Sequence, residues 1–302
     1  MHFSMSSGTA VSGLISSNTT WSYANSPYIV TDNILLQNGA TLTIEPGVTI
    51  KMLSDTEFQV RGELIAQGTS SSKITFTSNA SSPAAGDWGK LYFFDEATDA
   101  SFSDNTYTGG SILEYCIVEY AQELYTQSSA PYVHYSEFRY NSERGIKSEG
   151  SPGIRINNCD IHHNYKGIEI SDSNSLIDYN TIRDNTPGGG GYISGGFYYN
   201  TIKNNTVSTD NNNYCHDCGG GIKFGGGVFD HNIISGNSGG DAAFFLNTSS
   251  GEVTNNIIFN NDSDDDAVEI DNDGPTTFTH NIVIGKTNFD GISFEKLADD
   301  LF

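Results

Sequence analysis

The sequence predicts an all-β protein whose strands coil into a parallel β-helix, a single-stranded solenoid of about eleven coils. Two observations lead to this prediction. Good helix formers are scarce, with 14 Lys+Arg in 302 residues, whereas Gly alone numbers 33 and Asn, Ser and Thr abound. In addition, one short template recurs along the chain, mostly every 20 to 25 residues or so, which is a spacing typical of solenoid repeats.

The repeat begins with an apolar residue, has Asn or a small residue fourth, and has Ile, Val or Phe sixth. It occurs as LEYCIVEYA (113–121), VHYSEFRYN (133–141), INNCDIHHN (156–164), IDYNTIRDN (177–185), FYYNTIKNN (197–205), FDHNIISGN (229–237), VTNNIIFNN (253–261) and FTHNIVIGK (278–286). After most templates a small residue introduces a second apolar strand, as in Gly145-Ile146-Lys147. Three short strands per repeat describe one coil, paired to the next about 4.8 Å along the axis. An α/β solenoid is excluded because no repeat shows helical periodicity.

The fourth template position predicts a column of buried side chains at a bend. It is occupied by Cys116, Ser136, Cys159, Asn180, Asn200, Asn232, Asn256 and Asn281. Stacked Asn amides can satisfy backbone groups that a buried bend leaves unpaired, and Asn tolerates the left-handed backbone of such a bend. We therefore assign these asparagines a structural role. Two coil steps, about 10 Å, separate Cys116 from Cys159, which predicts two buried, reduced thiols.

The segments before the repeat carry a resemblance to a known family. The stretch TTWSYANSPYIVTDNILLQNGATLTIEPGVTIKM (19–52), with GELIAQGTSSSKITFTS (62–78), GDWGKLYF (86–93) and the Asn-rich repeats, is similar to right-handed parallel β-helix repeat proteins of bacterial surfaces and secretions. The resemblance implies a right-handed helix whose first coils are closed by a capping layer. We expect one domain, with a disordered or extraneous N-terminus (1–18), a cap and first coils (19–80), the β-helix (81–295) and a C-terminal tail or cap (296–302).

Composition and charge limit the partners and the location. A net charge of -23 disfavours nucleic acid and anionic membrane surfaces, and no apolar run is long enough to insert into a membrane. Residues 1–13 lack the basic and apolar regions of a signal peptide, so an exported protein is expected to have lost it. The resemblance implies a secreted or cell-surface protein. Four cysteines are too few for a disulfide framework.

Alternation around the inward sixth position places its neighbours on the outside. The column after it reads Glu119, Arg139, His162, Arg183, Lys203, Ser235, Phe259 and Ile284, and the column before it includes Glu137 and Asp160. A second outward column, beyond the next turn, is predicted to be Lys147, Glu169, Ile193, Lys223, Phe244 and Glu269. Residues 139–223 hold 8 basic and 9 acidic residues, whereas residues 224–302 hold 2 and 14, so the cations gather on a few middle coils.

Two interpretations of the outward charges are open. In one, Arg139, Asp160, Arg183, Lys147 and Glu169 form salt bridges between coils. In the other, a shallow groove binds an acidic or neutral polysaccharide through Arg forks and Tyr ring faces. The residues of that candidate groove are Arg139, His162, Arg183, Lys203, Tyr140 and Tyr199.

The same face offers candidate catalytic residues. A polysaccharide lyase needs a cation for the uronate carboxylate and a base for the C5 proton, and the candidates are Arg139, His162, Arg183, Lys147 and Lys223. A hydrolase needs two carboxylates about 5 to 10 Å apart, for which Asp160 could act with Glu137 or Glu169. Signature motifs of polygalacturonase-like enzymes are absent. If the protein is an enzyme, a lyase is the first expectation.

Two other segments are candidate metal or redox sites. The longest interruption of the repeat (206–218) carries Cys215-His216-Asp217-Cys218, which could form a disulfide, paired thiols, a zinc site or a redox centre. A late acidic cluster could bind Ca²⁺ or remain a solvated loop. Its candidate ligands are Asp241, Asp264, Asp266, Asp271 and Asp290, of which Asp241, Asp266 and Asp290 are predicted to share one column. No other cofactor is expected.

These observations predict an extracellular β-helix scaffold. Non-catalytic carbohydrate binding or adhesion is the first expectation, with a polysaccharide or surface glycan as partner. One alternative is a lyase or glycoside hydrolase acting on an acidic polysaccharide. The other is a structural surface subunit that assembles with copies of itself.

Overall fold

The computed structural model describes residues 8–150, 152–208, 219–240, 242–246, 251–262, 266–271, 276–285 and 287–290. These residues form an all-β parallel β-helix of about 11 turns, which confirms the predicted fold class. The only helical element among them is the single 3₁₀ turn η1 (Tyr23–Asn25). The chain divides into two compact units, Met1–Glu143 and Arg144–Phe302, where the sequence suggested one domain. Among the described residues, no helix is long and apolar enough to cross a membrane.

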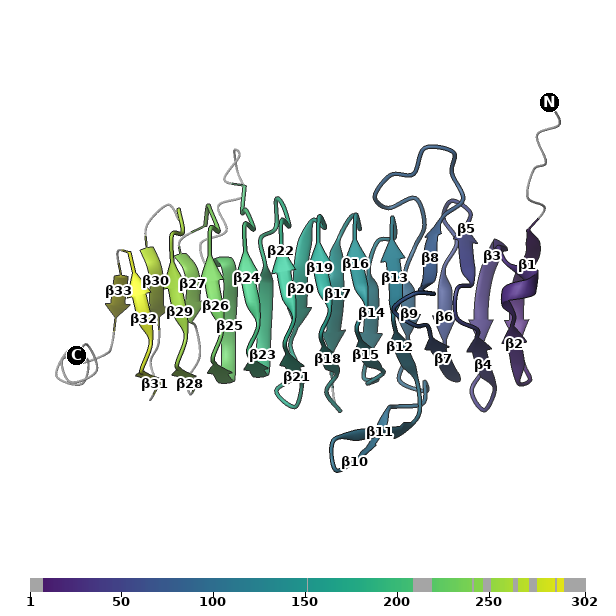
Figure 1. Ribbon diagram of the computed structural model, residues 1–302, viewed down its shortest axis with the longest axis horizontal. Helices are drawn as coiled ribbons and strands as arrows, with labels where there is room; N and C mark the ends of the chain where they lie inside the picture. Colours follow the sequence, from purple (N-terminus) through teal and green to yellow (C-terminus); the bar gives the residue numbers. More distant parts are fainter. Residues whose placement is uncertain are drawn as a thin grey trace. The chain divides into compact units, whose positions relative to one another are not determined.

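In the first unit, strands of successive coils pair in parallel ladders (Figure 1). One ladder contains β5 (Thr49–Met52), β8 (Ile74–Ser78), β13 (Cys116–Glu119) and β16 (Glu137–Arg139). A second contains β6 (Phe58–Val60), β9 (Leu91–Phe93) and β14 (Leu124–Gln127). A third contains β2 (Thr19–Trp21), β4 (Thr41–Ile44), β7 (Glu63–Gln67), β12 (Ile112–Glu114) and β15 (Tyr132–His134). An antiparallel hairpin of β10 (Ser101–Ser103) and β11 (Thr106–Gly109) projects from these ladders.

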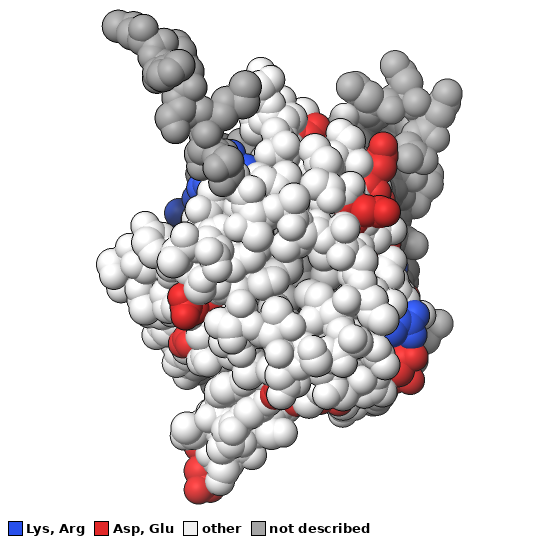
Figure 2. Space-filling view, turned by 90° about the vertical axis from the view of Figure 1, so that its right-hand side faces the viewer, with Lys and Arg blue, Asp and Glu red and all other residues white. Residues whose placement is uncertain are grey.

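The first coil begins earlier than the sequence suggested. Residues 9–15, expected to precede the ordered part, form β1 (Thr9–Ile15), which pairs with β3 (Tyr28–Leu36). Trp21 and Tyr28 are each 4% exposed and stack with ring centroids 4.7 Å apart, so aromatic rings fill the start of this core. Figure 2 shows the side of the molecule on which β1 lies, and its centre is free of Lys, Arg, Asp and Glu.

The second unit repeats the three-ladder pattern. One ladder contains β19 (Asp160–His162), β22 (Thr181–Arg183), β24 (Thr201–Lys203), β26 (Ile233–Ser235), β29 (Ile257–Phe259) and β32 (Ile282–Ile284). A second contains β17 (Arg144–Glu149), β20 (Lys166–Ile170), β23 (Gly191–Tyr198), β25 (Gly219–Asp230), β27 (Ala242–Leu246), β30 (Asp266–Asp271) and β33 (Thr287–Asp290). A third contains β18 (Arg155–Asn157), β21 (Leu176–Asp178), the later parts of β23 and β25, β28 (Gly251–Thr254) and β31 (Thr276–Thr279).

The core follows the sixth template position. Seven of its eight members are 0% exposed: Val118, Phe138, Ile161, Ile182, Ile202, Ile234 and Ile258. The eighth, Val283 in the last repeat, is half-buried. Cys116 and Cys159 are buried thiols, as predicted. The second outward column was predicted wrongly at two coils, because Ile193 and Phe244 are 0% exposed. The register instead aligns Glu169 with Tyr192 and Lys223 with Phe245. At these two coils the sequence has runs of small residues, Gly188–Gly191 and Ala242-Ala243. Such runs do not show which residue begins the alternation of inward and outward side chains.

The fourth-position asparagines of the second unit are hydrogen bonded from coil to coil. Asn180 Nδ2 donates to Asn200 Oδ1 and to Ile156 O, both at 3.0 Å, and the same pattern continues through Asn232 and Asn256 to Asn281. A second column of asparagines occupies the ninth template position, with Asn164, Asn185, Asn205 and Asn237 buried and Asn261 half-buried. Each column thus satisfies backbone carbonyls at its own bend.

The left-handed residue of each bend lies one position earlier than predicted. It is the residue before the Asn, as at Tyr179 (φ 57°), Tyr199 (φ 56°) and Asp184 (φ 53°). The chain turns at this residue, so that the following Asn can point its amide inward while its own N–H donates to the next coil, as Asn180 N does to Asn200 Oδ1 at 2.8 Å. The prediction that Asn itself adopts the left-handed backbone is therefore wrong.

Candidate functional site

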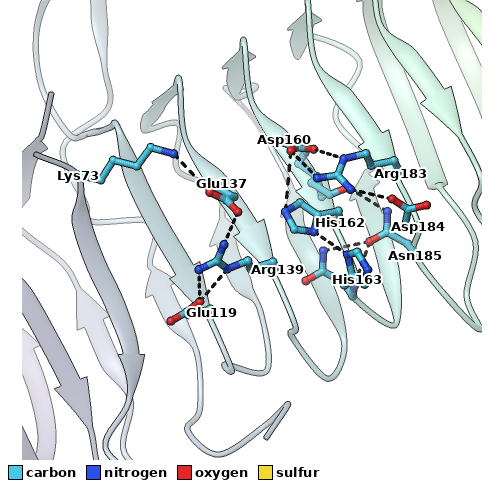
Figure 3. Close-up of polar contacts among 12 residues, drawn as sticks. Lys73, Glu119, Glu137, Arg139, Asp160, His162, His163, Arg183, Asp184 and Asn185 are labelled. Atoms are coloured by element: carbon cyan, nitrogen blue, oxygen red, sulfur yellow. Dashed lines mark hydrogen bonds and ion pairs between the residues drawn. The ribbon is translucent and has the colours of Figure 1, made fainter. Parts of the chain in front are cut away.

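In the first unit, Arg139 is enclosed by carboxylates (Figure 3). Its Nη2 lies 2.7 Å from Glu119 Oε2 and its Nη1 lies 2.6 Å from Glu137 Oε1, while Lys73 Nζ lies 3.3 Å from Glu137 Oε2. Burial lowers the pKa of Arg139, but its hydrogen bonds with Glu119 and Glu137 outweigh this and raise the pKa. The guanidinium is thus neutralised within the unit. Its Cζ also lies 5.9 Å from the ring centroid of Tyr140.

In the second unit, Arg183 is held in the same way (Figure 3). Its Nε and Nη2 donate to the two oxygens of Asp160 at 3.0 and 2.8 Å, and its Nη1 donates to Asp184 Oδ2 at 2.7 Å. The hydrogen bonds that Arg183 donates to Asp160 are the largest cause of the raised pKa of Arg183. This bidentate geometry is the one that a guanidinium prefers for a carboxylate. The two guanidinium N–H groups that we predicted to bind a uronate carboxylate therefore bind Asp160 instead.

His162 is outward by register but only 5% exposed. Its Nδ1 lies 2.7 Å from His163 Nδ1, so one ring must donate the proton and the other accept it. Asp160 Oδ2 lies 3.9 Å from the other ring nitrogen, Nε2. Burial and the neighbouring His162 lower the pKa of His163. The histidine pair is thus engaged inside the unit, and His162 is poorly placed to take a proton from a bound polymer.

The remaining candidate charges are also paired or covered. Glu169 accepts from Arg144 Nε at 3.0 Å and lies 3.1 Å from Lys166 Nζ. Lys147 pairs with Glu149 at 3.1 Å, and Lys223 Nζ lies 5.0 Å from the ring centroid of Phe245. Burial raises the pKa of Glu169, but the two cations outweigh it and lower the pKa. A glycosidase acid needs the opposite shift, so Glu169 is a poor general acid.

We predict that Glu169→Gln destabilises the protein at neutral pH by about 1 kcal/mol, because two cations lose a partly buried partner. The lowered pKa means that this stabilisation is present above the unfolded pKa and is lost as the pH falls through the folded pKa. Denaturant midpoints of the wild type and variant should therefore differ at pH 7, and the difference should shrink at a pH well below the usual pKa of a Glu carboxyl, about 4.3. An equal difference at both pH values would show that the ion pairs are not the cause.

A more open surface lies on β22 and β24, where two coils present the same three residue types. It consists of Tyr179, Thr181, Arg183, Tyr199, Thr201 and Lys203, and we call it the Tyr–Thr–cation surface. The strand register aligns Thr181 with Thr201 and Arg183 with Lys203. Tyr179 and Tyr199 are 54% and 46% exposed and stack at 5.0 Å with an interplanar angle of 4°. Each ring therefore covers one face of the other, and those two faces are closed to a sugar ring.

An Asp–His pair that we did not predict adjoins this surface. His231 Nδ1 lies 2.7 Å from Asp230 Oδ2, and Asp230 Oδ1 accepts hydrogen bonds from Thr254 and Asn255. Burial raises the pKa of Asp230, but these hydrogen bonds lower it overall. The His231 ring stacks on Tyr199 at 4.9 Å. The template could have revealed it, since His231 precedes Asn232 just as Tyr199 precedes Asn200.

Several predicted ligands lie outside the described residues. Asp241, Asp264 and the Cys215-His216-Asp217-Cys218 motif fall there, as does most of the 206–218 loop. The predicted acidic column is wrong in register, because Asp266 aligns with Ala242 and Asp290 aligns with Asp271. The calcium hypothesis remains a prediction.

Comparisons with known proteins agree with this architecture. A family model described as a pectate-lyase-like β-helix domain matches residues 13–128. A second, described as periplasmic copper-binding protein (NosD), matches residues 92–267, which is more than half of the chain. The chain belongs to the NosD family. This assignment agrees with the predicted resemblance to right-handed parallel β-helix repeat proteins.

Two individual proteins are similar to this NosD-family chain. Protein bark beetle of Drosophila melanogaster is 42% identical over 57 residues, which is 19% of this chain and 2% of that protein. The chain thus matches only a small part of that relative. A crystal structure of a mutant of the periplasmic alginate epimerase AlgG aligns with a TM-score of 0.47 and 13% identity, covering 86% of this chain and 78% of the other.

The family description names copper, so the donor set matters. Within the described parts of the chain, no three His, Cys, Asp or Glu side chains converge in a way that could hold a metal ion. The nearest arrangement is the pair His162 and His163, whose Nδ1 atoms already contact each other, with Asp160 near the opposite nitrogen of His162. Copper needs several nitrogen, oxygen or sulfur ligands around one point. The described residues of this NosD-family chain therefore do not fit a copper site.

Proposed function

We propose that this protein is a periplasmic or extracellular β-helix scaffold that binds a polysaccharide or surface glycan without cleaving it. The observation that carries the proposal is the two-coil repeat of the Tyr–Thr–cation surface, in which Tyr179 and Tyr199 are exposed and the other four residues are half-buried. The family's periplasmic description and the pectate-lyase-like domain match support the location and the ligand class.

The spacing of the surface suits a polymer. Neighbouring coils repeat about every 4.8 Å, which is close to the length of one sugar in an extended glycan chain. Successive sugars could therefore meet equivalent Tyr and Thr hydroxyl groups and successive cations. Lys203 has no ion pair among the described residues, whereas Arg183 is held by Asp160 and Asp184. We infer that Lys203 binds the acidic groups of the glycan and that Arg183 mainly links its coil to the coil of Asp160.

The state of the charged residues supports binding over catalysis. The three candidate carboxylates, Glu137, Asp160 and Glu169, each accept from a cation. The candidate neutralisers Arg139 and Arg183 are each bound by two carboxylates. A lyase or hydrolase would have to break these pairs before using either kind of group, and breaking a partly buried pair is costly.

We expect Tyr199→Ala combined with Lys203→Ala to weaken glycan binding at least about tenfold, because a hydroxyl-bearing ring and a charge are lost together. A glycan array identifies the ligand, and titration calorimetry then measures Kd for both proteins. Tyr165→Ala is the matched control, because Tyr165 is 47% exposed against 46% for Tyr199 but lies at a different bend. If the control loses as much glycan affinity as the double variant, or if the double variant loses none, the binding site lies elsewhere.

The enzymatic alternative is tested on the same polysaccharides. A lyase creates an unsaturated uronate that absorbs in the ultraviolet, and a hydrolase creates new reducing ends. We expect neither product from any substrate that binds. If a product forms with the wild type but not with His231→Ala, catalysis would instead be assigned to the Asp230–His231 pair. In this pair the His231 Nδ1 atom lies 2.7 Å from the Asp230 carboxylate.

A further inference from the structure

The stacked rings of the Tyr–Thr–cation surface continue onto one more coil. The residue before the Asn of each bend is Tyr179, then Tyr199, then His231, with left-handed φ of 57°, 56° and 56°. Tyr179 stacks on Tyr199 at 5.0 Å, and Tyr199 stacks on His231 at 4.9 Å. The strand register agrees, because β26, which follows His231, pairs with β24. The three rings therefore form one row on three successive coils.

A carboxylate holds the last ring of this row. His231 Nδ1 lies 2.7 Å from Asp230 Oδ2, and the His231 side chain is 46% exposed. Asp230 Oδ1 accepts from Thr254 Oγ1 at 2.7 Å and from Asn255 Nδ2 at 2.8 Å, so the carboxylate itself is fixed. Since an ionised carboxylate can only accept hydrogen bonds, His231 Nδ1 must carry the hydrogen in this contact. These contacts set the position of the imidazole and leave Nε2 as its second hydrogen-bonding atom.

This second ring nitrogen is available to a ligand. Within the described part of the chain, no residue hydrogen bonds with His231 Nε2. Nε2 accepts a hydrogen bond when the imidazole is neutral and donates one when it is protonated. A sugar hydroxyl can both donate and accept, so it suits Nε2 in either state, whereas a carboxylate suits the protonated state alone. The position therefore matches a hydroxyl group better than an acidic group.

The outward residues of the ladder show where the polar surface ends. At the Thr and Lys positions of β24, the next strand β26 carries Ile233 and Ser235, and β29 carries Ile257 and Phe259. Ile257 and Phe259 are 39% and 37% exposed, so the coil after that of His231 presents apolar side chains at both positions. Polar contacts to a glycan along this ladder therefore end at the coil of His231 and Ser235, which carries no Lys or Arg at these positions.

We propose that the glycan site extends over three coils and takes an oligouronate, with Lys203 at a carboxylate and His231 Nε2 at a hydroxyl of the next sugar. This inference rests on the proposed function, because it extends the same surface by one coil and narrows its ligand to an acidic glycan. His231 contacts the sugar directly, and Asp230 is a positioning residue that acts through the imidazole. The spacing of about 4.8 Å between coils allows adjacent sugars to reach adjacent coils.

Isothermal titration calorimetry with hexagalacturonate and hexamannuronate measures the contribution of Nε2. His231→Phe keeps a stacking ring and removes both nitrogens, and an aromatic ring fits this backbone because Tyr199 has the same φ. We expect Kd to rise about three- to tenfold, the range for one lost hydrogen bond. His280→Phe is the matched control, because His280 is exposed, has the same φ of 56° and lies two coils further along the row. Its Kd should equal that of the wild type, and denaturant midpoints verify that both variants fold.

Two substitutions of Asp230 test its positioning role. In Asp230→Asn, Oδ1 can still accept from Thr254 and Asn255, which places the amide nitrogen at His231 Nδ1. Nδ1 must then accept, so nitrogen NMR at a pH where the ring is neutral should show the hydrogen on Nε2, with Kd within about twofold of the wild type because a hydroxyl also accepts. Asp230→Ala should raise Kd instead. An unchanged tautomer in Asp230→Asn would show that Asp230 does not position the ring.

Comparison with Tyr199→Ala/Lys203→Ala separates this inference from the proposed function. A rise in Kd for the double variant but not for His231→Phe would overturn the third position and leave the two-coil surface. A rise for His231→Phe alone would overturn the three-coil site, because Lys203 would then contribute nothing. An equal rise for His280→Phe, or no binding of either oligouronate, would also overturn it. The glycan array decides the proposed function separately, because a neutral glycan that loses affinity in the double variant would still support it.

Discussion

Replacing Gly190 by alanine is expected to destabilise the second unit strongly. A Cβ at this position would lie 1.8 Å from the carbonyl oxygen of Gly221 in the next coil. That oxygen belongs to the backbone, so it can move only if the two coils separate and their ladder hydrogen bonds break. Gly190 N itself donates to Gly220 O at 3.3 Å, within the same contact. We expect a loss of roughly 3 kcal/mol or more in the free energy of unfolding.

Gly109→Ala is the matched control for this experiment. Its Cβ would meet no atom within 4 Å, so the same substitution in the β10–β11 hairpin should be nearly neutral. Circular dichroism measures the strands of the whole chain, whereas Trp21 and Trp88, the only 2 tryptophans, report on the first unit. The variant should lose part of the β signal at a denaturant concentration where the tryptophan signal persists. A wild-type midpoint for Gly190→Ala would mean that the coils are less tightly stacked than this geometry requires.

The fold could be predicted because its main determinant is periodic. Each template carries its own inward residue, so Ile182, Ile202 and Ile234 could be identified without knowing which coil pairs with which. In the second outward column, the register was lost where small residues remove the contrast between apolar and polar positions, as at Gly191, which aligns with Ile168. Local alternation therefore predicts the core well, and fails where glycine replaces the side chain that would reveal the face.

The candidate site was harder to predict, because it depends on choices between neighbouring coils. Arg183 could pair with a carboxylate on its own coil or on the coil before, and in the structure it uses both Asp184 and Asp160. The sequence also does not reveal that coil spacing places the Tyr179 and Tyr199 rings on each other. Both effects turn groups that looked available for a ligand into groups that stabilise the stack. In the proposed function, what remains for a ligand is Lys203 with the Tyr and Thr hydroxyl groups of the Tyr–Thr–cation surface.

The buried asparagine columns lead to the second large prediction, a loss of roughly 3 to 5 kcal/mol for Asn185→Leu. Asn185 is 0% exposed, and its Nδ2 donates to Ile161 O at 3.0 Å and to Asn205 Oδ1 at 2.9 Å. Its Oδ1 accepts from the N–H and the Nδ2 of Asn164, both at 3.0 Å. Leucine has a similar volume, so the core stays filled while these four hydrogen bonds are lost in a dry environment.

Two further substitutions separate hydrogen bonding from packing. Asn204→Gly, at the exposed left-handed residue just before Asn205, should change the free energy of unfolding by less than about 0.5 kcal/mol, because glycine adopts φ 56° without strain. Asn185→Asp keeps the shape and the acceptor, but at neutral pH it places a charge beside Ile161 O and Asn205 Oδ1. Protonation restores one donor, so this variant should recover stability relative to Asn185→Leu as the pH falls toward 4. If all three variants unfold at the wild-type midpoint, the columns contribute only packing, and the coils must be held by their strand ladders alone.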